Sequence, residues 1–222
     1  LNDAPTPFSG GSRVLQERLL SPRRLAGAAA LAALALLALS GAAALAERPL
    51  TPLFAFAAIG LLAAYSFPPL RLAYRGGGEL LQGLGVGLVL PLLGFYLQSG
   101  RIAGAPWPLS ALLVGFGAVS NVITALPDAR GDRRAGKRTW PVRRGERRAA
   151  RDALLALGLG LGLAVPLVPH PAVLALPALF AVGAALEHAR GDRARTVRFV
   201  FFAGGAIPIL QLSWALALFV GG

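Results

Sequence analysis

Residues 127–145 read P-D-A-R-G-D-R-R-A-G-K-R-T-W-P-V-R-R-G, with seven Lys/Arg and two Asp in this stretch. Long apolar runs lie on either side of it, at Leu109–Leu126 and Ala153–Leu167. This contrast is typical of a polar loop between membrane-spanning helices, because charged groups are costly inside hydrocarbon. The stretch therefore predicts a membrane fold, and it raises the question of why two carboxylates lie in so basic a loop.

The composition of the whole chain agrees with a membrane protein. Of 222 residues, 55% are hydrophobic and only 14% are charged. Apolar runs approach the ~20 residues that a helix needs to cross a ~30 Å hydrocarbon core, and they lack the strict alternation of a barrel strand. We expect an all-α, polytopic transmembrane bundle, formed by residues 1–222 as one membrane-embedded domain. The seven predicted spans are Leu25–Ala46, Leu53–Ser66, Leu80–Leu97, Leu109–Leu126, Ala153–Leu167, Ala172–Leu186 and Phe199–Val220.

The basic residues alternate along these spans. Twenty of the 22 Lys/Arg fall on one side of a seven-span arrangement, and only Arg48 and Arg101 fall on the other. The positive-inside rule places the basic side in the cytoplasm. The formal charge of +12 is thus an orientation signal at a lipid bilayer, and we expect no nucleic-acid partner. Nine of the ten acidic residues share the basic side, so chemistry is expected there.

Asp128 and Asp132 are four residues apart, which would place both carboxylates on one face of a helical turn. Mg²⁺ is often held by one or two carboxylates together with substrate phosphates. The pair could therefore hold a Mg²⁺–diphosphate, or it could simply offset the surrounding Arg residues at a solvated surface. The spacing alone leaves both interpretations open.

Gly136-Lys137-Arg138-Thr139 follows the acidic pair. A flexible backbone position, two cations and a hydroxyl suit the binding of phosphate oxygens. The two cations could also balance the charge of the carboxylates when no substrate is bound.

A second unusual stretch runs from Tyr65 to Gly76, Y-S-F-P-P-L-R-L-A-Y-R-G. The paired prolines end a helix, and Arg71 and Arg75 could point at the same anion. An interfacial belt of Tyr and Arg explains the stretch equally well. Near the N-terminus, residues 9–13 (S-G-G-S-R) would form either an anion-binding nest or a plain linker.

Glycines in the later spans suit close packing of helices. Gly158 and Gly162 have the four-residue spacing of a G-x-x-x-G face, with Gly160 between them. An Ala/Gly-rich composition would also produce this spacing by drift, so the pattern leaves packing open. Pro166, Pro169 and Pro171 predict a tight turn or broken helices between the fifth and sixth spans.

Three stretches together resemble the UbiA superfamily of intramembrane prenyltransferases. They are S-G-G-S-R-V-L-Q-E-R-L-L-S-P (9–22), Y-S-F-P-P-L-R-L-A-Y-R-G-G-G-E (65–79), and D-x-x-x-D followed by G-K-R-T and V-R-x-G within 127–145. Their order on alternate loops is similar to the family pattern, most of all to that of the 1,4-dihydroxy-2-naphthoate polyprenyltransferases of menaquinone biosynthesis.

The resemblance implies a nine-helix fold, of which the seven runs here would be the third to the ninth. A first aspartate-rich motif, N-D-x-x-D, would precede Ser9. Asn2-Asp3 matches it poorly, because the closing Asp would fall on Thr6. We therefore expect two helices and the first motif to be absent from this N-terminally truncated chain. Thr124 is a second departure, at a position where relatives often carry Asn or an acidic residue.

The resemblance also implies an activity, the Mg²⁺-dependent transfer of a polyprenyl group from a diphosphate to an aromatic acceptor at the cytoplasmic face of the inner membrane. Asp128 and Asp132 would be the catalytic metal ligands. The diphosphate and its chain would be bound by Tyr65, Arg71, Arg75, Lys137 and Arg138. An inactive remnant of the fold is the alternative. A transporter is a further one, disfavoured because the spans contain almost no ionisable residues.

Overall fold

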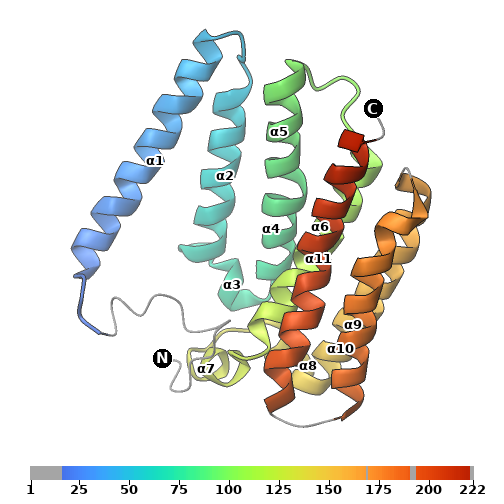
Figure 1. Ribbon diagram of the computed structural model, residues 1–222. Helices are drawn as coiled ribbons and strands as arrows, with labels where there is room; N and C mark the ends of the chain where they lie inside the picture. The colour runs from blue at the N-terminus through green and yellow to red at the C-terminus, as the bar shows by residue number, and fades with distance from the viewer. Residues whose placement is uncertain (1–16, 169, 191–193, 221–222) are drawn as a thin grey trace.

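A computed structural model describes residues 17–168, 170–190 and 194–220. Within these ranges the chain is 81% helical and contains no strand. Figure 1 shows the longer helices side by side, with the short ones gathered at one end. The α-helices are α1 Pro22–Leu45, α2 Thr51–Ser66, α3 Leu72–Arg75, α4 Gly78–Leu84, α5 Leu90–Ser99, α6 Trp107–Ala125, α7 Ala129–Arg134, α8 Trp140–Arg144, α9 Glu146–Ala164, α10 Ala175–Arg190 and α11 Ala194–Val220. The π-helical turn η1 is Gly85–Val89, and the 3₁₀ turns are η2 Val165–Leu167 and η3 Pro171–Leu174.

All seven predicted spans are helical, and the all-α polytopic class is confirmed. Two stretches, Thr51–Ser66 and Thr196–Leu212, are apolar but shorter than the rest. Five are long and apolar enough to cross a membrane: Pro22–Leu45, Gly78–Ser99, Trp107–Ala125, Glu146–Leu167 and Pro171–Ala189. The third span is one rod built from α4, η1 and α5.

Local sequence signals set several helix ends. Ser21 accepts a hydrogen bond from the Arg24 backbone N–H at 3.3 Å, and Pro22 occupies the first position of α1. Gly100 ends α5 with φ +73°, a conformation that glycine adopts without strain. The predicted break after the fifth span is confirmed, because the 3₁₀ turns η2 and η3 follow α9.

One side of the bundle, which we call the packed side, consists of α4, α6, α9, α10 and α11. Its buried core includes Phe116 and Ile123 of α6, Leu157 of α9 and Leu210 of α11. The α4–η1–α5 rod and α6 approach closely at glycines. A Cβ built at Gly87 would lie only 2.3 Å from the Leu113 carbonyl carbon.

The G-x-x-x-G spacing in α9, which the sequence left open, does not form a packed face in this structure. A Cβ at Gly158 or Gly162 would meet nothing within 4 Å. Gly160 packs instead, since a Cβ there would lie 2.8 Å from the Phe116 ring. Of the two interpretations of this spacing, the structure therefore favours compositional drift, and the buried positions of α9 include Leu157, Gly160 and Leu161.

The other side, which we call the open side, consists of α1 and α2. Helix α1 packs mainly on α2 and leans away from the bundle toward its N-terminal end (Figure 1). Within α1, all of which the structure describes, Ser40 is the only buried residue. The Thr51 hydroxyl donates to the Ser40 carbonyl oxygen at 2.6 Å and ties the two helices together.

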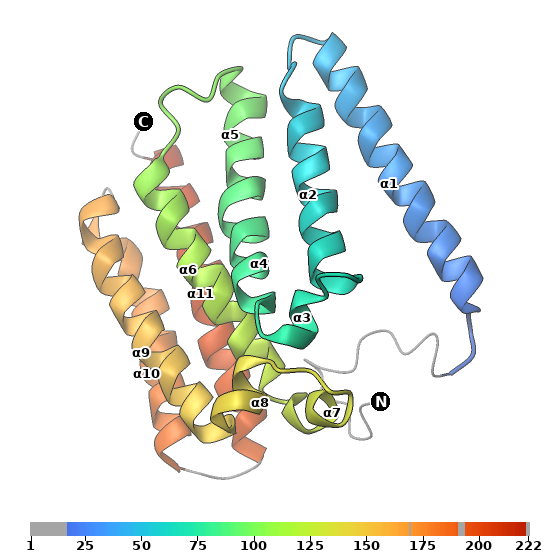
Figure 2. The same ribbon diagram turned by 180° about the vertical axis from the view of Figure 1, so that it is seen from behind.

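Charged residues separate to the two ends of the bundle. The start of α1 lies at the same end as α3, α7 and α8, as both views show (Figures 1 and 2). We call this end, with its connecting residues 67–77 and 126–145, the loop end. At the opposite end Arg48 donates from Nε to the Leu97 carbonyl oxygen at 2.9 Å. This separation agrees with the alternation predicted from the sequence.

Candidate functional site

The two predicted carboxylates lie on one helical turn. Asp128 immediately precedes α7, and the Asp132 backbone N–H donates to the Asp128 carbonyl oxygen at 2.8 Å. Asp132 is buried, with 8% of its surface exposed, whereas Asp128 is half-buried. The chain therefore folds as the four-residue spacing predicts, with both acidic residues in the same turn.

Lys137 closes onto this turn. Its Nζ lies 2.7 Å from Asp132 Oδ1, and its backbone N–H donates to the Asp132 carbonyl oxygen at 2.9 Å. Gly136 makes the reversal possible with φ +72°. Burial lowers the pKa of the Lys137 ammonium, but the hydrogen bond and charge of Asp132 outweigh it, so this pKa lies above its ordinary value of 10.5. Lys137 is thus a cation paired with the acidic turn.

The two predicted loops meet at Tyr74. The Arg138 backbone N–H donates to the Tyr74 carbonyl oxygen at 3.1 Å. The Arg71 guanidinium lies 4.0 Å above the centre of the Tyr74 ring, and Lys137 Nζ lies 5.8 Å from it. Gly76 allows this approach, because a Cβ there would lie 3.0 Å from the Arg138 carbonyl oxygen. Residues 64 positions apart in the chain, Tyr74 and Arg138, are thereby joined at the loop end.

Arg71 and Arg75 occupy different settings. Arg71 precedes α3 with φ +41°, outside the helical turn, so the four-residue spacing does not by itself place the two guanidinium groups together. Arg75 is the last residue of α3 and is exposed, as is the side chain of Arg138. The structure therefore brings Arg71 and Lys137 to the Tyr74 ring, with Asp132 paired to Lys137, and the side chains of Arg71, Arg75 and Arg138 are all exposed.

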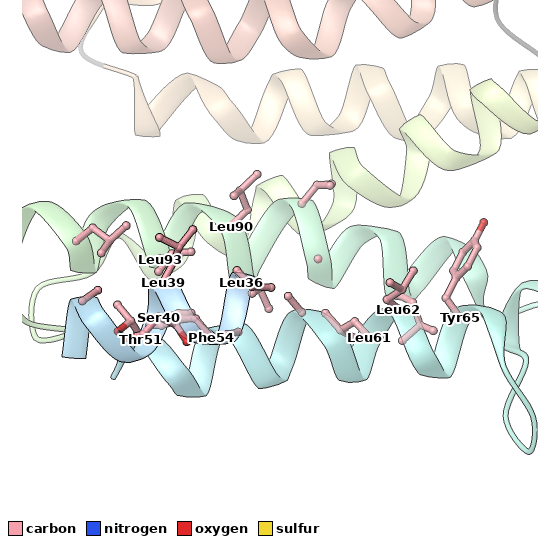
Figure 3. A pocket seen from close by; sticks show the side chains of 18 of the residues that line it. Leu36, Leu39, Ser40, Thr51, Phe54, Leu61, Leu62, Tyr65, Leu90 and Leu93 are labelled. Carbon is pink, nitrogen blue, oxygen red and sulfur yellow. Dashed lines mark hydrogen bonds between the residues drawn. The ribbon is translucent and has the colours of Figure 1, made fainter. Parts of the chain in front are cut away.

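An apolar cavity of about 650 Å³ begins beside this cluster. It lies between α1, α2 and the α4–η1–α5 rod, and its walls are mostly Leu, Val, Ala and Phe. Figure 3 shows Tyr65 at one end of the lining, well apart from Ser40 and Thr51. The Tyr65 ring lies at the start of α4, where a Cβ built at Gly78 would lie 3.1 Å both from Tyr65 Cε2 and from the Ala73 Cα, so Tyr65 is beside α3, which carries Tyr74. A long apolar pocket thus ends at a group of cations and carboxylates.

The wider π-helical turn η1 contributes to the cavity wall through Gly85, Val86 and Val89. The same turn carries Gly87 on its other face, against α6. One short segment therefore both packs tightly and borders the empty space.

The family model described as the UbiA prenyltransferase family matches residues 11–205 of the chain. The chain belongs to this family. No curated protein and no solved structure gives a significant match. Membership in the UbiA family implies prenyl transfer to an aromatic acceptor, carried out by a multi-pass membrane protein. Two stretches considered in the sequence, residues 9–13 and Asn2-Asp3, lie outside the residues that the structure describes.

The site's donors suit the diphosphate that a UbiA enzyme uses. Lys137, paired with Asp132, and Arg71, over the Tyr74 ring, provide cations at the loop end. Thr139 Oγ1 is buried and, within the described part of the chain, makes no hydrogen bond. A buried hydroxyl without a partner is costly, and a phosphate oxygen would satisfy it.

The donors also suit Mg²⁺. Asp128 and Asp132 offer hard carboxylate oxygens from one turn, which matches an ion that takes its other ligands from phosphate and water. Among the described residues there is no group of three or more His, Cys, Asp or Glu that would hold a metal unaided. The pair therefore fits Mg²⁺ as a partner of bound diphosphate rather than as an independent metal site.

Sequence reasoning missed four residues of the site. Tyr74 joins the two loops. Glu79, Trp140 and Asp152 anchor the loop formed by residues 126–145 to α4 and α9. The sequence offers one indication, because the indole N–H of a tryptophan within so charged a loop needs a hydrogen-bond partner, as Trp140 does. The partners themselves lie on other helices, and no local spacing points to them.

Proposed function

We propose that this chain carries out Mg²⁺-dependent transfer of a polyprenyl group from polyprenyl diphosphate to an aromatic acceptor. One observation supports this most. An apolar cavity that would suit an isoprenoid chain ends at Tyr65, beside the cluster of Asp132, Lys137 and Arg71. A polyprenyl diphosphate has the same two parts, an apolar tail and an anionic head.

The diphosphate head would bind at the loop end. Lys137 and Arg138 follow the acidic turn directly, and Arg71 faces them from the other loop across Tyr74. Arg75 would supply further positive charge there. When bound at Asp128 and Asp132, Mg²⁺ supplies positive charge that stabilises a leaving diphosphate. Lys137 would exchange its Asp132 partner for phosphate oxygens, which keeps its ammonium paired in both states.

The prenyl chain would lie along the cavity, with its reactive carbon near Tyr65. Departure of diphosphate leaves an allylic cation, and the electron-rich ring of the acceptor forms the new carbon–carbon bond and loses a proton. The apolar lining keeps water away from the cation, which water would otherwise quench. The residues of the cavity would thus hold the prenyl chain and exclude water, and those of the loop end would stabilise the leaving diphosphate.

Within the family, we propose 1,4-dihydroxy-2-naphthoate as the acceptor and menaquinone biosynthesis as the setting, because the motif pattern in residues 65–79 and 127–145 is most similar to those enzymes. The distribution of Lys/Arg supports a location in the inner membrane with the loop end in the cytoplasm. The match and the packing support a single domain over the described chain.

The test is prenyl transfer in membranes that contain this chain. Polyprenyl diphosphate is supplied with 1,4-dihydroxy-2-naphthoate or with 4-hydroxybenzoate, and prenylated product is measured. We expect product with the naphthoate, and loss of at least about 100-fold in Asp128→Asn and Asp132→Asn. Glu146→Gln is the matched control, since Glu146 is an exposed carboxylate at the same end and should be dispensable.

Product with 4-hydroxybenzoate alone would refute the proposed acceptor and retain the activity. Absence of transfer to any aromatic ring, in a chain that is folded in the membrane, would favour a catalytically incomplete remnant instead. Full activity in both Asp variants would exclude the proposed role of the acidic turn.

A further inference from the structure

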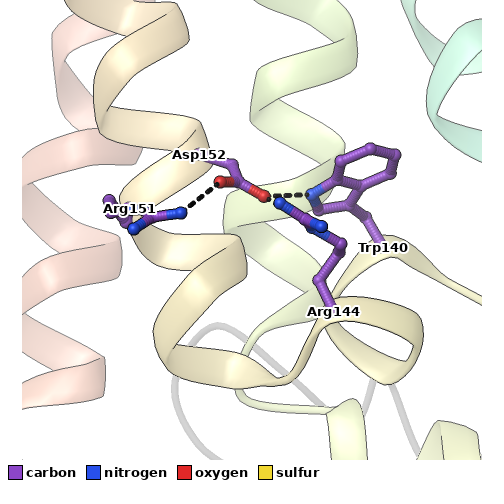
Figure 4. Close-up of polar contacts among 4 residues, drawn as sticks. All are labelled: Trp140, Arg144, Arg151 and Asp152. Carbon is purple, nitrogen blue, oxygen red and sulfur yellow. Dashed lines mark hydrogen bonds and ion pairs between the residues drawn. The ribbon is translucent and has the colours of Figure 1, made fainter.

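Asp152 connects α9 to the loop that carries Lys137 and Arg138. One of its oxygens, Oδ2, accepts the Trp140 indole N–H at 3.0 Å and the Arg144 Nε–H at 3.1 Å (Figure 4). Its other oxygen, Oδ1, lies 3.8 Å from an Arg151 nitrogen. The side chain is 21% exposed, so these bonds are partly shielded from water. A carboxylate with several donors in one setting is a strong local anchor.

Trp140 is held at two points by two different helices. Its backbone N–H donates to Glu79 Oε1 of α4 at 2.6 Å, and its indole N–H donates to Asp152 of α9. The ring packs against the buried core of the packed side. Trp140 therefore transmits the position of the rigid helices to the start of α8.

The residues just before Trp140 are those proposed to bind diphosphate. Thr139 adjoins it, and the Arg138 backbone is bonded to Tyr74 on the other loop. Lys137 is bonded to Asp132 through both backbone and side chain. Any rotation at Trp140 would therefore shift Thr139 and Arg138 relative to Asp132, because the peptide units between them are short and planar.

We propose that Asp152 is a positioning residue that acts through Trp140 to hold Lys137, Arg138 and Thr139 where diphosphate binds. This inference rests on the proposed function. Asp152 itself lies on α9, away from the carboxylate turn, and contacts the loop through Trp140 and Arg144. Its contribution is to geometry, and small displacements of binding groups are known to cost large factors in rate.

A purely structural anchor would behave differently. If Asp152 only fastened α8 to α9, its loss would lower the melting temperature and the amount of folded protein, with the same Michaelis constants for the molecules that remain folded. A positioning role predicts a selective rise in KM for the diphosphate substrate, with KM for the aromatic acceptor unchanged.

The experiment compares Asp152→Ala, Asp152→Asn, Trp140→Phe and the double variant Asp152→Ala/Trp140→Phe. We expect Asp152→Ala and Trp140→Phe each to raise KM for polyprenyl diphosphate about tenfold, the effect of losing one hydrogen bond to a charged group. The double variant should raise KM for polyprenyl diphosphate no more than the single variant with the larger effect, because both substitutions remove the same contact between Asp152 and Trp140. Asp152→Asn retains an oxygen acceptor and should recover most of the affinity. Arg151→Ala is the matched control. Its KM for polyprenyl diphosphate should equal that of wild type, since the Arg151 side chain is 60% exposed and its nearest nitrogen lies 3.8 Å from Asp152 Oδ1.

A second readout does not require turnover. In a Trp107→Phe/Trp214→Phe background, Trp140 is the only tryptophan, and its fluorescence reports the titration of inorganic diphosphate with Mg²⁺. We expect Asp152→Ala to weaken this titration about tenfold, as it weakens substrate binding.

The outcomes separate the two proposals. If wild type transfers prenyl groups while Asp152→Ala and Trp140→Phe leave KM for diphosphate unchanged or have additive effects, the positioning role is wrong and the function stands. If wild type neither transfers prenyl groups nor binds inorganic diphosphate, the proposed function fails, and the positioning role fails with it.

Discussion

The packed side and the open side of this bundle are built from similar residues and pack very differently. On the packed side, Phe116, Ile123 and Leu210 are almost fully buried, and α4 and α6 meet through glycines. On the open side, α1 buries only Ser40 among its described residues, and a cavity of about 650 Å³ lies between α1, α2 and the α4–η1–α5 rod. Hydrophobic composition alone therefore does not decide where a membrane bundle is dense.

The difference between the packed side and the open side matches the two parts of the site, the charged loop and the apolar cavity. The loop with Asp132 and Lys137 is anchored to the packed side through Glu79 and Asp152, so its geometry depends on rigid helices. The cavity lies on the open side, where a flexible chain needs room. We infer that changes on the packed side affect stability and the diphosphate site, whereas changes on the open side affect the prenyl chain.

The largest expected effect tests the dense contact of η1 with α6. Gly87→Leu would force a side chain into the backbone of α6, where a Cβ already lies 2.3 Å from the Leu113 carbonyl carbon. We expect destabilisation at or above about 3 kcal/mol, the upper range for overpacking. Thermal unfolding in detergent would measure it. Gly94→Leu is the control, because a Cβ there meets nothing within 4 Å; equal effects of both changes would contradict the packed contact.

The next effect concerns the cation at the loop end. Lys137→Met should raise KM for polyprenyl diphosphate about tenfold or more, because a hydrogen bond between charged groups is lost. Steady-state kinetics with each substrate varied in turn would show this. KM for the aromatic acceptor should remain unchanged. A rise in KM for the acceptor alone would contradict the assignment of Lys137 to the diphosphate.

A smaller effect is expected on the open side. Ala58 lines the cavity, and Ala58→Trp would fill part of it. We expect a loss of about 1 kcal/mol in binding of a long prenyl chain, or roughly fivefold in KM, and little change for a short one. Ala63→Trp on the same helix is the control, since Ala63 is exposed and does not line the cavity. Equal effects on short and long chains would show that the cavity does not hold the chain.

The smallest effect is the pH dependence of the Lys137–Asp132 pair. The pKa of Lys137 is raised by folding, so the stabilisation is fully present below the ordinary value of 10.5 and is lost as pH rises through the folded-state pKa. The free energy of unfolding of wild type should exceed that of Lys137→Met by about 1 kcal/mol at neutral pH, and the difference should shrink as pH rises above 10.5. Unfolding measured from pH 7 to 11 would show it; a difference that grows with pH would contradict the pairing.

Much of this fold follows from sequence because single helices are local. Apolar runs predict the seven long helical spans, and the spacing of Asp128 and Asp132 predicts the turn they share. Contacts between segments are not local. The meeting of Tyr74 with Arg138, or of Trp140 with Asp152, depends on how helices pack, and no short pattern encodes it. Gly158 and Gly162 illustrate the same limit, since their spacing is right and Gly160 forms the contact.

The most direct test of the central claim is metal-dependent turnover in membranes that contain this chain. Prenyl transfer from polyprenyl diphosphate to 1,4-dihydroxy-2-naphthoate is measured with EDTA and then with Mg²⁺ restored. The account predicts product that disappears with EDTA, returns with Mg²⁺ and is absent in Asp132→Asn. Transfer that continues in EDTA, or that persists in Asp132→Asn, would contradict the assignment of the loop end as the diphosphate and metal site.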